Sequence, residues 1–189
     1  EIFDFANRRN AGGGRGLIIA QKSIMQSAWG DEIDRAAPGM MYGLATAANR
    51  EQPFLDSTHD VVIINPAGLK LLQTKPQLLK GFDSLMIDES TVIKNPDTQT
   101  FKIVRKIAQQ MAWRRCMTGT PNPNTVLDFW TQAYILDRGE RLSDSYWKFR
   151  NVACTPKQVG PDPRHIEWVD KEGIENVVFD LLSDIDRKS

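Results

Sequence analysis

The chain has 189 residues, and its 24 Lys plus Arg balance 24 Asp plus Glu, so the formal net charge is zero. This length suits one globular domain with a sizeable core and argues against two full domains. Neutrality excludes a global positive field that would attract nucleic acid, so any DNA contact must come from local groups. The composition, 41% hydrophobic and 25% charged, is that of a soluble folded protein and excludes a membrane-spanning one.

Short apolar runs alternate with amphipathic helical patterns along the first two thirds of the sequence. The runs are apolar on both faces, as the strands of a buried parallel sheet require. The pattern therefore predicts an α/β fold, a three-layer sandwich around a mainly parallel sheet with right-handed crossovers. In chain order we expect a strand at Gly16–Ala20, a helix burying Met25, Trp29 and Ile33, strands at Met40–Leu44, Val61–Ile64 and Ser84–Ile87, a helix burying Phe101, Val104, Ala108 and Met111, and a strand at Arg115–Met117.

The C-terminal part has a different texture. Residues 155–163 are rich in Pro and Gly and cannot continue a helix or a central strand. A last helix is expected to place Ile174, Val177, Val178, Leu181 and Ile185 on one face. We therefore divide the chain into a main unit, residues 1–150, and a Pro/Gly-rich excursion with a closing helix, residues 151–189.

Two adjacent carboxylates, Asp88 and Glu89, directly follow the strand at Ser84–Ile87. Their mutual repulsion and desolvation at the end of an apolar strand carry a cost that packing does not explain. Mg²⁺ would relieve it, with one carboxylate binding the metal and the other orienting a water for attack on phosphorus. The competing interpretation is that one carboxylate only caps the following helix.

A second polar strand end is Met117-Thr118-Gly119-Thr120-Pro121. Two hydroxyls that bracket a glycine and precede a proline give a rigid turn with close access to the backbone. The alternative is an ordinary turn that ends with Asn124 as the cap of the next helix.

Taken together and in this order, the two strand ends resemble motifs II and III of superfamily 2 helicases. Other stretches resemble the Swi/Snf-type branch of that superfamily, in particular its phage and prophage members. They are Leu17–Ile24 with Ser27–Ile33 as motif Ia, Val61–Lys70 as the next strand and loop, Asp88–Asn95 as an extended motif II, and Asp128–Leu142 with Phe149-Arg150 as the stretch after motif III.

The resemblance implies the first RecA-like lobe of a DNA-dependent ATPase, a helicase or translocase that uses ATP and Mg²⁺ on duplex DNA. Asp88 would hold Mg²⁺ and Glu89 would activate the attacking water. The expected partners are duplex DNA and a second RecA-like lobe, with no membrane, and the expected location is the cytoplasm, that of a bacterial host if a phage encodes the protein. Coupling of the ATP cleft to DNA would fall to Ser90, Thr118, Gly119 and Thr120, and contacts with the DNA backbone to Lys22, Ser23 and Asn65.

The sequence departs from the family pattern in several places. No GxxxxGK[ST] phosphate loop occurs in it, and the glycine-rich Ala11–Gly16 precedes a strand instead of following one. We therefore expect residues 1–150 to be a lobe that begins just after the phosphate loop, and the isolated chain to be inactive. Gln21 replaces a usual proline, and Thr91 replaces a histidine common in relatives.

Two alternatives keep part of this interpretation. A non-catalytic module that descends from such a lobe and binds nucleic acid or protein would share the fold without the chemistry. A Rossmann-type oxidoreductase or transferase ranks far lower, because no GxGxxG follows the first strand. We expect Trp113, Trp130 and Trp147 to be core residues rather than base-stacking platforms, and Cys116 to be a small buried residue.

Overall fold

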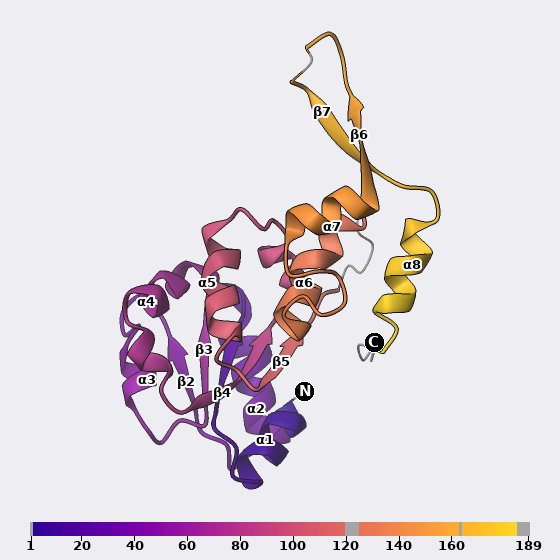
Figure 1. The fold of residues 1–189 in the computed structure, drawn as a ribbon. Coiled ribbons are helices and arrows are strands. Elements are labelled where there is room, and N and C mark those ends of the chain that lie inside the picture. Colours follow the sequence, from indigo (N-terminus) through magenta and orange to yellow (C-terminus); the bar gives the residue numbers. More distant parts are fainter. Residues whose placement is uncertain (1, 120–124, 163, 185–189) are drawn as a thin grey trace.

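The computed structural model describes residues 2–119, 125–162 and 164–184. A five-stranded sheet forms its centre, with the strand order β2-β3-β1-β4-β5 and every neighbouring pair parallel (Figure 1). The strands are β1 (Arg15–Ile19), β2 (Tyr42–Ala45), β3 (Val61–Ile64), β4 (Phe82–Ile87) and β5 (Trp113–Cys116), and an antiparallel pair, β6 (Cys154–Gln158) and β7 (Ile166–Asp170), stands apart from them.

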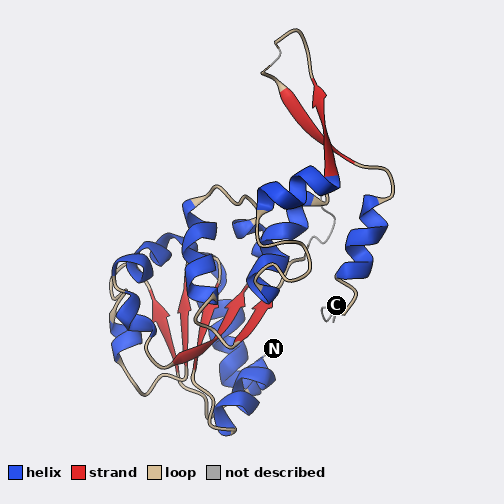
Figure 2. Cartoon of the chain, in the orientation of Figure 1, coloured by secondary structure: helices blue, strands red, loops and turns tan. Residues whose placement is uncertain are grey.

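Helices cover both faces of the sheet (Figure 2). The helices are α1 (Ile2–Asn10), α2 (Asp31–Ala36), α3 (Gln52–Leu55), α4 (Leu69–Thr74), α5 (Gln99–Ala108), α6 (Leu127–Asp137), α7 (Tyr146–Ala153) and α8 (Ile174–Leu181). A π-helix at Met25–Gly30 runs into α2, and short 3₁₀ turns lie at Lys22–Ile24, Pro66–Gly68, Pro76–Leu79 and Ser90–Ile93. No helix in the described ranges is long and apolar enough to cross a membrane.

The sheet separates two hydrophobic clusters, because successive strand residues point to opposite faces. Leu17 and Ile19 of β1 belong to the larger cluster, beneath α3 to α7, whereas Ile18 between them belongs to the smaller one, beneath α1 and α2. All three side chains are fully buried. This arrangement confirms the predicted three-layer α/β fold. The five predicted strands are all present, with ends shifted by at most two residues.

Helix α1 is fastened to the sheet by packing and by polar contacts. A Cβ at Gly16 would lie 2.3 Å from a ring carbon of Phe5, so glycine is needed where the helix crosses β1. The Asp83 carboxylate accepts hydrogen bonds from Arg8 (3.2 Å) and from the Gly14 backbone N–H (2.8 Å). Burial alone would raise the pKa of Asp83, but hydrogen bonds from Ser84 and Gly14 and the charge of Arg8 outweigh it and lower that pKa.

The C-terminal segment extends away from the sheet as a β6–β7 hairpin, followed by α8, which returns to the main body (Figure 1). Phe179 of α8 packs against Phe129 of α6 with ring centroids 5.5 Å apart. The predicted packing face of this helix is wrong in part, since Val178 is buried but Val177 and Leu181 are exposed. Ile185 lies outside the described residues.

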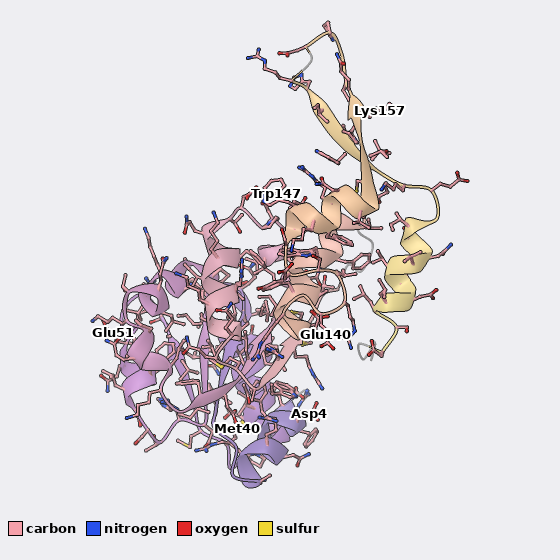
Figure 3. The ribbon with its side chains drawn as sticks, viewed as in Figure 1. Asp4, Met40, Glu51, Glu140, Trp147 and Lys157 are labelled. Carbon is pink, nitrogen blue, oxygen red and sulfur yellow. The ribbon has the colours of Figure 1, made fainter. Side chains whose placement is uncertain are left out.

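The tryptophans that were predicted to be core residues differ in their burial. Trp130 is buried, as expected, but Trp147 is 52% exposed on α7 and points outward (Figure 3). The guanidinium of Arg150 lies 4.5 Å from the Trp147 ring and 3.7 Å from that of Trp168 in the hairpin. The expectation that Trp147 is a core residue is therefore wrong, because α7 lies at the rim of the fold where the hairpin departs.

Candidate active site at the carboxyl edge of the sheet

The candidate site lies at the carboxyl edge of the sheet, where four strands end in register. Ile64 of β3, Ile19 of β1, Ile87 of β4 and Cys116 of β5 form one row across the sheet. The next residues are Asn65, Ala20, Asp88 and Met117, and neighbouring strands lie roughly 4.8 Å apart. Parallel strand order therefore brings together polar residues that are far apart in the sequence, at the edge where ligands of open α/β sheets bind.

Asp88 is anchored in this row by its backbone and its side chain. Its N–H donates to the Ile19 carbonyl (2.8 Å), and its Oδ2 accepts a hydrogen bond from Trp29 Nε1 (2.7 Å). No described residue forms a hydrogen bond or an ion pair with Oδ1. A cavity of about 350 Å³, lined in part by Trp29, Asp88 and Met117, opens beside the carboxylate.

Glu89 adopts a left-handed backbone conformation, with φ 50° and ψ 68°. This region is unusual for a residue with a Cβ and is found preferentially at functional sites. The carboxylate oxygen Oε1 accepts hydrogen bonds from the hydroxyls of Thr91 and Thr118, each at 3.0 Å. Because Thr118 belongs to the end of β5, the two polar strand ends are in direct contact.

Ser90 connects the end of β4 to a third element. Its backbone N–H donates to the Met117 carbonyl (2.7 Å), and its fully buried hydroxyl donates to Oε1 of Gln132 on α6 (2.8 Å). Nearby, Thr131 of α6 donates to the Lys94 carbonyl (3.4 Å). The segment after Asp88 is thus bonded to both β5 and α6.

Gly119 is exposed, and apart from its chain neighbours no described residue has a heavy atom within 4 Å of the position a Cβ would take. Thr120, the last residue predicted for coupling, lies outside the described residues.

The three residues predicted to contact DNA lie at the same edge of the sheet but on separate loops. Lys22 and Ser23 are exposed in the 3₁₀ turn after β1. Asn65 follows β3, and its Oδ1 accepts a hydrogen bond from the Gly68 backbone N–H (2.9 Å), which caps the next turn. The structure therefore gives Asn65 a local capping role in addition to the predicted DNA contact.

Two residues of this site were missed by sequence reasoning. Gln132 was not singled out, and Trp29 was interpreted only as part of a packing face. Trp29 is indeed buried, but its indole N–H points to Asp88. The helical spacing of Trp29 carries no signal for this contact, because the partner lies 59 residues away in the sequence.

The donor set suits a metal that takes few protein ligands. Among the described residues, no three His, Cys, Asp or Glu side chains gather closely enough to form a metal centre of their own. Mg²⁺ is commonly held by one or two carboxylates and completes its octahedron with waters and substrate phosphates. Asp88, with Oδ1 facing outward from its hydrogen bond to Trp29, fits that mode of binding.

A parallel sheet covered on both faces, with polar side chains gathered at its carboxyl edge, is typical of RecA-like α/β proteins. The model of the SNF2-related domain matches residues 6–157. The chain therefore belongs to the SNF2-related domain family.

Individual relatives agree with this assignment. Protein p41 of Acyrthosiphon pisum secondary endosymbiont phage 1 is 30% identical over 142 residues, which cover 70% of this chain and 31% of p41. The Sulfolobus solfataricus SWI2/SNF2 ATPase core in complex with dsDNA matches with a TM-score of 0.71 and 26% identity, over 95% of this chain and 34% of that one. The ATPase core domain from the same organism matches with a TM-score of 0.63, 22% identity, and coverage of 96% and 34%. The chain thus spans about a third of the length of these relatives.

Proposed function

We propose that this chain forms the first lobe of a DNA-dependent ATPase that couples hydrolysis of ATP to movement on duplex DNA. The observation that carries the proposal is the contact between the ends of β4 and β5, where Glu89 accepts a hydrogen bond from Thr118 beside Asp88. Membership of the SNF2-related family and the similarity to a SWI2/SNF2 ATPase core in complex with dsDNA support it.

In this proposal the two carboxylates have different tasks. Asp88 holds Mg²⁺, which neutralises charge on the ATP phosphates when it is bound. Glu89 orients the attacking water and accepts its proton. The two threonine hydroxyls that bond to Glu89 Oε1 fix the carboxylate, leaving Oε2 to face the water.

The hydrogen bonds around Ser90 and Thr118 supply the coupling path. Any displacement of the β5 end that accompanies DNA binding would move Thr118 and, through it, Glu89. Ser90 extends the same connection to Gln132 and α6. Gly119 and Thr120 complete the turn that we assign to this role.

We propose that Lys22, Ser23 and Asn65 contact phosphates of one DNA strand. Such contacts fix the position of the protein on the duplex and carry little sequence information. Few charges are involved, so the isolated chain should bind DNA weakly and with a shallow salt dependence.

We further propose that residues 1–150 form the ATPase lobe and that residues 151–189 close it. The sequence contains no GxxxxGK[ST] pattern, and the matched structures are about three times longer. A longer protein that carries this chain would supply the phosphate-binding loop and the second lobe.

ATPase assays with and without duplex DNA test the proposal, on this chain and on a form extended at both ends. Only the extended form should turn over ATP, and DNA should stimulate it. Glu89→Gln in the extended form should abolish turnover and spare ATP binding, whereas Glu140→Gln, at an exposed loop position, should leave the rate unchanged. Turnover that survives Glu89→Gln would refute the assigned role, and an extended form that never hydrolyses ATP would favour a non-catalytic binding module.

The DNA contacts need a separate test, which compares Lys22 with an exposed lysine on the other side of the sheet. Lys22→Ala in the extended form should weaken DNA binding and lower the slope of log K against log salt by about 1. Lys80→Ala removes the same charge just before β4, at the opposite edge of the sheet, and should change neither. Equal effects of the two substitutions would contradict the assigned DNA face.

A further inference from the structure

The strongest unassigned contact of the carboxyl edge is the hydrogen bond from Trp29 to Asp88. The Nε1–Oδ2 distance is 2.7 Å, at the short end of the range for an N–H donor. The indole ring is only 7% exposed. The donor is therefore buried, and its bond to the half-buried Asp88 is partly shielded from water.

The indole is held in place by the elements around it. Trp29 lies in the π-helix Met25–Gly30. Helices of this type are rare in proteins, but those that occur are often found at functional sites. Trp29 belongs to the smaller hydrophobic cluster, together with Ile18 of β1 and Met86 of β4. Ile18 and Met86 are paired in the sheet directly beneath the site. Packing against this cluster restricts the ring, and the hydrogen bond to Asp88 gives the direction of its N–H.

The geometry divides the Asp88 carboxylate into two functionally different oxygens. Oδ2 is engaged by Trp29, while Oδ1 has no hydrogen-bond or ion-pair partner among the described residues, and the residue lines the cavity together with Trp29 and Met117. A carboxylate whose second oxygen is bonded in this way rotates less freely, which favours coordination through Oδ1. Partners of this kind orient metal ligands, and their loss commonly weakens metal binding about 10–100-fold.

We propose that Trp29 is a positioning residue for the metal site, holding Asp88 so that Oδ1 is presented to a divalent cation. The proposal rests on the function proposed above, because it requires Asp88 to bind the metal. In this role Trp29 acts on the metal through Asp88.

The competing explanation is that the indole N–H simply satisfies its hydrogen-bonding capacity at the nearest acceptor. Under that explanation the loss of the N–H costs folding stability and leaves metal binding by Asp88 unchanged. A measurement of metal binding separates the two, whereas a measurement of stability does not.

The test uses Mn²⁺ as a paramagnetic probe on the 189-residue chain and follows line broadening in ¹⁵N NMR spectra. Amide signals of Ala20 and Met117 report on the site, because these residues flank Asp88 across the sheet. Asp88→Asn should abolish the Mn²⁺-induced broadening of these two signals, which identifies that broadening as dependent on Asp88. Trp29→Phe should weaken the Asp88-dependent Mn²⁺ affinity by about tenfold.

Two controls separate the hydrogen bond from packing. Replacement of Trp29 by 3-benzothienylalanine keeps the shape of the ring and deletes only the N–H donor, so it should weaken Mn²⁺ binding as much as Trp29→Phe does. Trp113→Phe removes an indole that packs against the same cluster from the β5 side, and should leave the affinity within about twofold of that of the unsubstituted chain.

The outcomes distinguish the positioning role of Trp29 from the metal-binding role of Asp88. Asp88-dependent broadening whose affinity is unchanged in both Trp29 variants overturns the positioning role and leaves the metal role of Asp88 standing. Broadening that persists in Asp88→Asn overturns the metal role itself, and with it the assignment of Trp29. If Trp29→Phe fails to fold, the benzothienyl variant provides the same comparison.

Discussion

The hydrogen bond from Ser90 to Gln132 is the contact most suited to a quantitative test. Ser90 is fully buried, and its hydroxyl lies 2.8 Å from Gln132 Oε1. Ser90→Ala removes the donor and leaves the amide oxygen unpaired in a partly buried position. The expected loss of unfolding free energy is about 1–2 kcal/mol. For a chain of this length each kcal/mol lowers the melting temperature by about 2–4 °C.

Urea unfolding of four variants isolates this bond. Gln132→Met alone removes the acceptor, and the double variant Ser90→Ala/Gln132→Met removes both groups. Because no polar group is then left unpaired, the double variant should be more stable than the sum of the two single losses predicts. The expected coupling energy is about 0.5–1.5 kcal/mol.

A matched control tests whether burial is the cause. The Ser183 hydroxyl donates to the Asp180 carbonyl at 2.7 Å, but it is exposed. Ser183→Ala should therefore change the stability by less than about 0.5 kcal/mol. If Ser90→Ala is equally mild, or the coupling energy with Gln132 is zero, then β4 and α6 are not joined in the way we describe.

Three further predictions concern the rest of the fold. Gly16→Ala should destabilise the chain by about 1–3 kcal/mol in urea unfolding, since the new Cβ overlaps the ring of Phe5, and Phe5→Leu in the same chain should recover part of the loss. Cys154 is buried, whereas Cys116 is only partly buried and not the fully buried residue that the sequence predicts, but desolvation raises the pKa of both thiols to about 12, so thiol labelling at mildly alkaline pH should be slow until urea unfolds the chain. The pKa of Asp83 is lowered by folding, so its stabilising effect is present above its unfolded pKa and is lost as the pH falls through its folded pKa. The stability difference from Asp83→Asn, measured by urea unfolding, should therefore shrink below about pH 4. Labelling as fast as in the unfolded chain, or a constant difference for Asp83→Asn, would contradict these assignments.

The sequence predicts the sheet well because a strand buried on both faces has a distinctive composition. Val61–Ile64 is apolar at every position, and the structure forms β3 over the same four residues. The start of the edge strand β5 was harder to predict, because Trp113 and Arg114 are only half-buried and one of them is charged, so they do not form an apolar run. Exposure of Trp147 could not be predicted, since the spacing of a tryptophan along a helix does not reveal whether another element covers it.

By itself, the sequence determined the layered α/β fold and the position of two polar strand ends, because strand burial and turn chemistry are local properties. Only the tertiary structure decided what those ends contact. Parallel register brings Glu89 to Thr118, and the packing of the π-helix brings Trp29 to Asp88. Contacts between groups so far apart along the chain depend on how the elements pack, which no local pattern of residues encodes.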